Sequence, residues 1–317
     1  MTMSIENWAQ RVCAGEDRAL SRAITAIENH APEAEELLRR LFPLTGKAYL
    51  TGITGAPGTG KSTLVDRLSA HYRAKQEQVG VIAVDPTSPY SGGAILGDRI
   101  RMQGHASDTG MFIRSMATRG FLGGLARATA EVALLLDAAG KQQVLIETVG
   151  VGQDEIDIVR LADCVMVLLV PGMGDDIQNM KAGLMEIGDI FVVNKADRPG
   201  ADKTVNDVTM MLSLVEEHGA WVPPIVKTVA SRGEGIADLD VALQKHFEYL
   251  AASGELERRN RERVRIRIET LLKEKFMGRL IGGSLPAGDY EKILDDVLGK
   301  RNNPHDAAES VLTRVQF

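Results

Sequence analysis

Residues 55 to 62 carry a residue pattern that binds phosphate groups. Gly55, Gly60, Lys61 and Ser62 match G-x-x-x-x-G-K-[ST] at every fixed position. Glycines let a backbone curl so that its N–H groups point inward at phosphate oxygens, and the following helix adds its positive N-terminal end. The lysine can reach the β- and γ-phosphates, and the serine hydroxyl can bind Mg²⁺. We expect the nucleotide phosphates to contact Gly55, Ala56, Pro57, Gly58, Thr59, Gly60, Lys61, Ser62 and Thr63.

Acidic residues that could hold the metal ion follow two apolar runs. One run ends at Asp85 and the other at Glu147, and Gly150 comes three residues after the second acid. An acid at this place can hold a Mg²⁺ ion or its water, and the glycine N–H can sense the γ-phosphate. Asp98 follows a long stretch rich in Pro, Gly and Ser, although an acid after a strand or loop can also be a helix cap. The predicted metal ligands are Ser62, Asp85, Asp98 and Glu147.

The residue after Gly150 bears on the rate of hydrolysis. In Ras-like switches a glutamine stands there and orients the attacking water, whereas this chain has Val151, with Gln153 two residues further on. A valine cannot orient water. We therefore expect slow intrinsic hydrolysis unless a partner supplies the missing group, because unassisted Ras-like rates lie roughly 10⁵-fold below assisted ones.

A second pattern, N-K-x-D, indicates which base is bound. Asn194, Lys195 and Asp197 follow the apolar run Ile190–Val193. An Asp carboxylate can accept hydrogen bonds from N1–H and the 2-amino group of guanine, and adenine has neither donor, so the mismatch discriminates on the order of 10⁴-fold. The asparagine can tether neighbouring loops, and the lysine can lie along the base. After the last predicted strand, backbone N–H groups that could contact the guanine oxygen belong to Ala230 and Ser231.

The elements around these motifs indicate an α/β fold. Short continuous apolar runs, each followed by a motif residue, are typical of strands in a parallel sheet that is buried on both faces. We predict a P-loop NTPase with a mostly parallel central sheet flanked by helices. Helical patterns before and after it predict three parts: an N-terminal helical arm at 1–44, a GTPase domain at 45–252 and a C-terminal helical dimerisation segment at 253–317. The arm could pack on the domain or grip a partner, and Trp8 favours the second reading because aromatic residues anchor interfaces.

Composition limits the other classes of function. The 317 residues are 44% hydrophobic and 25% charged with a net charge of −6, which favours no general nucleic-acid binding. No apolar run is long enough to span a membrane. The only cysteines, Cys13 and Cys164, form no C-x-x-C pair, and the six histidines are scattered, so the spacing shows no zinc or nickel set. The absence of a signal pattern and of a disulfide framework predicts a cytoplasmic protein.

Several longer segments together identify a resemblance. The chain is similar to the MeaB/MMAA/ArgK family of P-loop GTPases over nearly its whole length. The similarity rests on Gly55-Ala-Pro-Gly-Thr-Gly-Lys-Ser62, Asp85-Pro-Thr-Ser-Pro, Gly92-Gly-Ala-Ile-Leu-Gly-Asp-Arg-Ile-Arg-Met102, Leu122-Gly-Gly124, Glu147-Thr-Val-Gly-Val-Gly-Gln153, Pro171-Gly-Met-Gly-Asp-Asp-Ile-Gln178, Asn194-Lys-Ala-Asp197 and Asn303-Pro-His-Asp-Ala-Ala308. It departs from the family at Asp154, where members usually have Ser, and at Arg114-Ser-Met-Ala, where many have Arg-Pro-Ser.

The resemblance implies a GTPase that gates adenosylcobalamin loading and protects a cobalamin-dependent acyl-CoA mutase. The partner would be of the methylmalonyl-CoA, isobutyryl-CoA or 2-hydroxyisobutyryl-CoA type, and the cobalamin would be bound by that partner. Mg²⁺ and GTP or GDP would be bound by this chain, which would form a homodimer. The residues implied to act in catalysis are Lys61, Asp98, Glu147 and Lys181, the last within the additional switch at Pro171–Leu184.

Two other activities stay open at this point. An ArgK-like kinase would transfer phosphate to an acceptor and would use ATP, against which the guanine-reading pattern argues. A nickel-insertion GTPase would need Cys and His ligands near the switch loops, and Cys164 alone does not supply them. A purely structural protein is disfavoured by the complete nucleotide motif.

Overall fold

The computed structural model describes residues 4–85, 108–117, 124–148, 161–173, 187–214, 220–279 and 288–314. The chain divides into two compact units, Met1–Leu256 and Glu257–Phe317. Among the described residues, no helix is long and apolar enough to cross a membrane.

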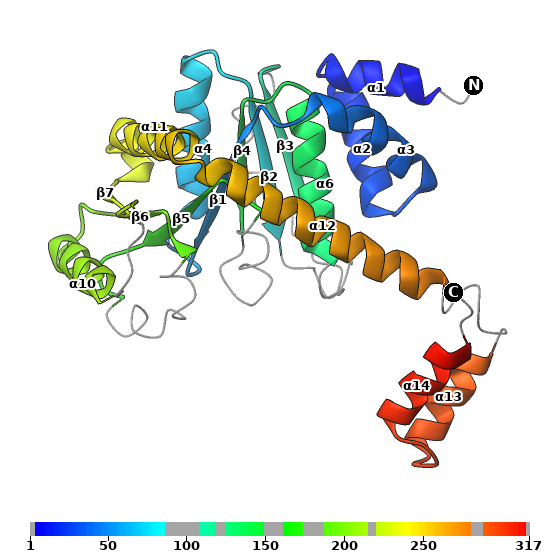
Figure 1. Cartoon of the computed structure of the whole chain (residues 1–317). Helices are drawn as coiled ribbons and strands as arrows, with labels where there is room; N and C mark the ends of the chain where they lie inside the picture. The colour runs from blue at the N-terminus through cyan, green and yellow to red at the C-terminus, as the bar shows by residue number, and fades with distance from the viewer. Residues whose placement is uncertain are drawn as a thin grey trace. The chain divides into compact units, whose positions relative to one another are not determined.

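Seven parallel strands form the sheet of the first unit (Figure 1). Their order across the sheet is β3-β2-β4-β1-β5-β6-β7, so the strand that leads into the phosphate loop is central. The strands are β1 (Tyr49–Gly55), β2 (Val79–Asp85), β3 (Met111–Ala117), β4 (Gln143–Glu147), β5 (Cys164–Leu169), β6 (Ile190–Val193) and β7 (Ile225–Lys227). The predicted parallel α/β architecture is confirmed.

Helices cover both faces of this sheet, as Figure 1 shows. One face packs on α4 (Lys61–Ala74) and α11 (Ile236–Ser253), and the other on α6 (Gly124–Ala138) and α10 (Ala201–Ser213). Because successive strand residues point to opposite faces, Leu145 joins the α4 cluster while Val144 and Ile146 join the α6 cluster. The same alternation puts Glu147 on the face that carries α4.

The N-terminal helices pack on α6. They are α1 (Ile5–Cys13), α2 (Asp17–Glu28) and α3 (Pro32–Leu41), followed by the short 3₁₀ helix η1 (Phe42–Leu44), and all three contact α6. Trp8 is only 2% exposed, donates its Nε1–H to the Ala19 carbonyl at 3.1 Å, and lies under the Arg22 guanidinium. Of the two readings of this segment, packing on the domain is the one observed, and Trp8 does not favour the other because its ring is buried within the helices of its own segment.

Arg114 on β3 contacts the N-terminal helices. Its guanidinium pairs with Glu28 of α2 and donates to the Thr25 hydroxyl at 3.3 Å. Both partners of the ion pair are largely buried. The pair thus ties the N-terminal helices to the edge strand of the sheet.

The second unit is helical. It contains most of α12 (Glu255–Arg279), together with α13 (Asp289–Leu298) and α14 (Pro304–Arg314), and the last two pack on each other. No residue of α12 is buried. Val264, Ile268 and Leu272 recur every four residues along it, and each is about half exposed.

Candidate nucleotide site

The phosphate loop joins β1 to α4 through two glycines that no other residue could replace without strain. Gly55 has a φ of +142°, and a Cβ there would lie 2.4 Å from the Leu168 carbonyl oxygen of β5. Gly60 has a φ of +95°, and its Cβ would lie 2.6 Å from Asn194 Nδ2. Positive φ and close packing both require glycine. The phosphate loop therefore packs closely against β5 itself and against the segment that follows β6.

Lys61 begins α4 and folds its side chain over the loop. Its Nζ donates to the carbonyl oxygens of Gly55 at 2.7 Å and Ala56 at 3.2 Å, and the residue is 7% exposed. An ammonium held at this place stands at the positive N-terminal end of the helix. The combination supplies cationic charge where the motif predicts the β- and γ-phosphates.

Ser62 and Glu147 meet beside that lysine. The Ser62 hydroxyl donates to Glu147 Oε1 at 2.6 Å, and Glu147 is 5% exposed. The two residues are 85 positions apart, and they meet because β4 ends next to β1, where α4 begins. A hydroxyl and a carboxylate oxygen are ligands that Mg²⁺ prefers. Two of the four predicted metal ligands therefore adjoin and fit the ion by their chemistry.

The remaining predicted residues of this region fall outside what the structure describes. Asp98, Gly150 and Lys181 belong to segments that are not described, and of Asp85 only the backbone is described, at the end of β2. Their assignment stays a prediction.

Asn194 links the base-reading segment to the phosphate loop. Its Nδ2 donates to the Thr59 carbonyl at 2.8 Å, and its Oδ1 accepts hydrogen bonds from the Thr228 hydroxyl and from Ala230 N–H, both at 3.1 Å. The side chain is buried, with 2% exposed. The contacts reach the phosphate loop and the segment that follows β7, so one amide joins its own segment to two others. The sequence predicted such a tether at Asn194 but did not predict Thr228 as its partner.

Asp197 and Lys195 lie at the open side of the same segment. The Asp197 side chain is 40% exposed and stands 3.6 Å from the Arg232 guanidinium. Lys195 adopts a left-handed φ of +56° and donates through Nζ to the Gly58 carbonyl at 2.7 Å. An accessible carboxylate above a lysine stem offers the acceptors and the flat aliphatic surface that a guanine base would use.

The candidates for the guanine oxygen differ in their geometry. Ala230 N–H is already engaged with Asn194, whereas Ser231 lies in the short 3₁₀ helix η3 (Ala230–Arg232) with its carbonyl bound by Arg67 at 3.3 Å. Sequence reasoning did not single out Arg232, which approaches Asp197 while paired with Glu234 at 2.8 Å. The sequence did offer one signal for Arg232, namely a basic residue standing between the serine and the glycine of this loop.

Comparisons with known proteins agree with this geometry. The family described as methylmalonyl Co-A mutase-associated GTPase MeaB matches residues 20–284. A Pyrococcus abyssi protein named as a GTPase is 48% identical over 314 residues, which cover 98% of this chain and 97% of that one. The GTPase ArgK of Escherichia coli is 37% identical over 256 residues, covering 78% of this chain and 77% of that protein.

A solved structure extends the similarity to the fold. The crystal structure of a LAO/AO transport system kinase has a TM-score of 0.72 and 26% identity, and it covers 99% of this chain and 98% of that chain. The predicted P-loop NTPase fold is thereby confirmed. With the family match over most of its length and relatives that are named GTPases, this chain belongs to the MeaB family of P-loop GTPases.

Proposed function

We propose that this GTPase is a chaperone of an adenosylcobalamin-dependent acyl-CoA mutase, gating cofactor loading and protecting the enzyme. The observation that carries the proposal is the Asn194 tether between the guanine-reading segment and the phosphate loop. It supports guanine selectivity in a family described by its association with methylmalonyl-CoA mutase. The mutase would be of the methylmalonyl-CoA, isobutyryl-CoA or 2-hydroxyisobutyryl-CoA type and would itself bind the cobalamin.

The described residues have separate roles in binding GTP. Asp197 accepts from the guanine N1–H and 2-amino groups, and Lys195 lies along the base. Lys61 leaves the Gly55 and Ala56 carbonyls to bind the β- and γ-phosphates, which offer it a formal negative charge in place of neutral oxygens. Ser62 and Glu147 hold Mg²⁺ or its water, together with Asp85 and Asp98.

Hydrolysis is slow in the isolated protein under this proposal. When bound, Mg²⁺ supplies charge stabilisation for the phosphates. Because Val151 cannot orient an attacking water, we assign the missing contribution to the complex with the mutase, in which Lys181 of the Pro171–Leu184 segment would complete the site. Loss of the γ-phosphate contact at Gly150 then releases the loops that GTP had ordered.

The second unit supports a homodimer. Val264, Ile268 and Leu272 are 48%, 53% and 61% exposed, and they share one face of α12. Closed two-fold dimers are the commonest oligomers, and an exposed apolar stripe of this spacing suits helix pairing. Replacing Ile268 by Asp should give a monomer in sedimentation analysis, while the same replacement at the exposed Ser253 should leave the dimer intact.

The decisive experiment measures phosphate release from GTP and from ATP, with and without the cobalamin-dependent mutase of the same organism. Slow GTP turnover that rises many-fold with the mutase is the expected result. A rate indifferent to the mutase would overturn the partner and leave the GTPase standing. A preference for ATP would overturn the role of Asp197.

A kinase is the second candidate, because the similar solved structure is described as a transport system kinase. The kinase and the proposed GTPase differ in where the γ-phosphate goes. A kinase would transfer the labelled γ-phosphate to an acceptor molecule, whereas the proposed GTPase releases all of it as inorganic phosphate, so incubation with γ-labelled GTP and the candidate acceptor distinguishes the two.

A further inference from the structure

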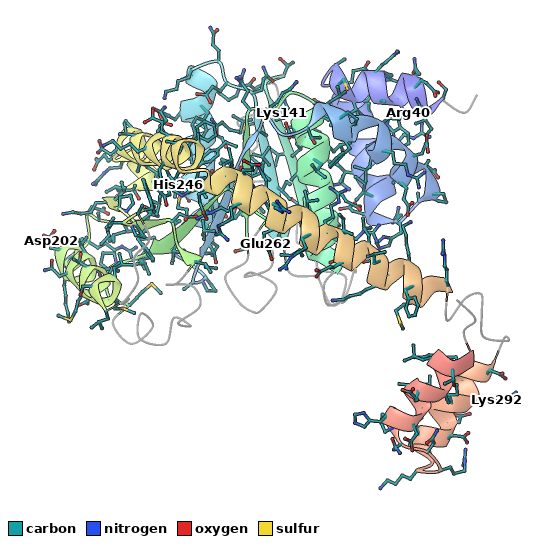
Figure 2. The ribbon with its side chains drawn as sticks, in the orientation of Figure 1. Arg40, Lys141, Asp202, His246, Glu262 and Lys292 are labelled. Carbon is teal, nitrogen blue, oxygen red and sulfur yellow. The ribbon has the colours of Figure 1, made fainter. Side chains whose placement is uncertain are left out.

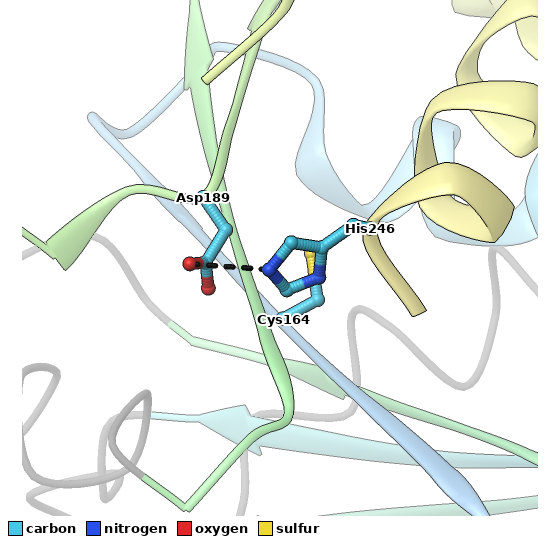
Figure 3. Close-up of side chains that lie close together, drawn as sticks. All are labelled: Cys164, Asp189 and His246. Atoms are coloured by element: carbon cyan, nitrogen blue, oxygen red, sulfur yellow. Dashed lines mark ion pairs between the residues drawn. The ribbon is translucent and has the colours of Figure 1, made fainter. Parts of the chain in front are cut away.

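A cysteine, an aspartate and a histidine converge in the core of the first unit, away from the nucleotide site. One ligand atom each from Cys164, Asp189 and His246 lie within 4.8 Å of one another (Figure 3). Cys164 and His246 are fully buried, and Asp189 is 6% exposed. Cys164 begins β5, Asp189 immediately precedes β6, and His246 projects from α11 (Figure 2).

The cluster and the phosphate loop lie at opposite ends of the strands. Cys164 and Asp189 lie at the amino ends of their strands, whereas the loop follows the carboxyl end of β1. Tyr49, which contacts the cluster, begins β1, and Gly55 ends it. At roughly 3.3 Å per strand residue, these two ends are about 20 Å apart. A ligand at the cluster would therefore be separate from the nucleotide and its magnesium.

His246 presents a buried nitrogen to the other two residues. Its Nδ1 is paired with the Tyr49 hydroxyl at 2.9 Å. Its Nε2 is buried and makes no hydrogen bond with any described residue, although Asp189 Oδ1 lies 3.3 Å away. A buried polar atom without a hydrogen bond costs about 1–3 kcal/mol, so such atoms call for a further partner.

Surrounding contacts orient the three side chains. Asp189 Oδ2 accepts the Val165 N–H at 2.8 Å, which turns Oδ1 toward the imidazole. Trp221 donates its indole N–H to the Asp189 carbonyl at 2.9 Å and packs edge-on against the His246 ring. The Tyr49 hydroxyl, paired with Nδ1 of His246, holds the other side of the imidazole ring. Such supporting hydrogen bonds are what fix metal-binding histidines and carboxylates.

We propose that Cys164, Asp189 and His246 bind a structural zinc ion. Thiolate, imidazole and carboxylate are the three ligand types that zinc takes, and its tetrahedral bonds place ligand atoms about 3.5 Å apart. The 3.3 Å between His246 Nε2 and Asp189 Oδ1 already meets this spacing. Zinc with one thiolate and one carboxylate is neutral overall, which suits a buried site.

The bound ion would join three elements that the sequence separates. It would link β5, the segment before β6, and α11, and its binding free energy would add to the stability of the fold. Binding displaces the thiol proton of Cys164 to solvent while a sulfur–metal bond forms, so affinity falls as pH is lowered.

The test uses the full-length chain without a polyhistidine tag, refolded with Co²⁺ in place of zinc and with excess Mg²⁺ to occupy the nucleotide site. We expect about one Co²⁺ per chain and a thiolate-to-cobalt charge-transfer absorption. The oxygen ligands of the nucleotide site cannot produce that absorption. Cys164→Ser should abolish it, and the matched control Cys13→Ser should keep it.

Stability supplies a second measurement. Zinc should raise the thermal midpoint of the wild type and of Cys13→Ser, and a chelator should reverse the rise, whereas His246→Gln should weaken zinc binding at least about tenfold. The chain has only two cysteines, so an absorption that persists in Cys13→Ser assigns Cys164 even if Cys164→Ser does not fold. Absence of the absorption from refolded wild type, or its persistence in a folded Cys164→Ser protein, would overturn the proposal.

Discussion

The Ser62 hydroxyl donates to Glu147 Oε1 across 2.6 Å, bringing the first turn of α4 to the end of β4. A hydroxyl on a helix N-terminus and a carboxylate at a strand end adjoin only because β4 is hydrogen-bonded to β1 in register, with Ile53 opposite Glu147. The pair gives the phosphate loop its acidic neighbour. Removal of the Ser62 hydroxyl oxygen alone therefore tests how nucleotide binding depends on magnesium.

Ser62→Ala should weaken nucleotide affinity in the presence of Mg²⁺ by about 10- to 100-fold, because a metal ligand is lost. Affinity measured with a chelator should change little. Fluorescent-nucleotide titration with and without the chelator checks this. The control is Ser69→Ala in the same helix. It removes a buried hydroxyl, and that hydroxyl has no hydrogen bond among the described residues. An equal loss under both conditions would show that Ser62 acts on the loop and not through the metal.

Asp197→Asn should change the preferred base of the nucleotide site from guanine to xanthine. The carboxylate accepts from the guanine N1–H and 2-amino groups, whereas the asparagine amide would donate to the xanthine 2-oxygen. We expect GTP affinity to fall on the order of 10³-fold or more and xanthosine triphosphate to become the better ligand. Competition binding with both nucleotides measures the exchange. Asp202→Asn, an exposed aspartate on α10 paired with Lys227, should change neither affinity. Unchanged guanine preference in Asp197→Asn would remove Asp197 from the base site.

Gly60→Ala should destabilise the nucleotide-free protein by more than backbone strain alone. A non-glycine residue at positive φ costs about 1–2 kcal/mol. At Gly60 the added Cβ also lies 2.6 Å from Asn194 Nδ2, whose amide is held by the Thr59 carbonyl and cannot move aside without losing that bond. Gly140→Ala isolates the strain, because Gly140 has a φ of +80° with nothing within 4 Å of its Cβ. Urea unfolding of both variants measures the difference between their losses in the free energy of unfolding. Equal losses would mean that the loop accommodates the added Cβ without further destabilisation.

Lys141→Met should remove a pH dependence of stability. Lys141 (labelled in Figure 2) is 3% exposed, and burial lowers the pKa of its ammonium. Between this lowered pKa and the ordinary lysine value near 10.5, the unfolded chain binds more protons than the folded one, so the free energy of unfolding rises with pH across that window. Methionine should abolish the rise. The substitution removes the hydrogen bond from Lys141 Nζ to the Gly110 carbonyl, which keeps its second hydrogen bond, from Val79 N–H. The exposed Lys245→Met is the control, and urea unfolding at several pH values decides.

The nucleotide motifs could be predicted because their chemistry is local. A phosphate loop needs glycines, a lysine and a hydroxyl within eight residues, and the guanine reader needs three side chains within four. The parallel sheet was also predictable, since a strand buried on both faces is a continuous apolar run. The apolar run Ile190–Val193 coincides with β6.

Contacts between distant segments were beyond sequence reasoning. Trp8 favoured a partner-gripping arm, yet its ring is buried, and nothing in the sequence pairs Arg114 with Glu28. A side chain's type does not reveal which helix will cover it. The tether from Asn194 to Thr228 spans 34 residues and depends on how β6 and β7 align.

The sequence by itself determined the GTPase motifs, the order of strands and helices along the chain and the apolar faces that bury them. Tertiary structure alone decided which residues meet across the sheet. Cys164, Asp189 and His246 are separated by 25 and 57 positions, and the histidines had appeared scattered with no metal-binding set. Parallel pairing brings the amino ends of β5 and β6 together, and α11 lays its histidine over them. Spacing along a chain encodes only contacts within a loop or helix turn, whereas contacts between strands depend on the order in which the sheet assembles them.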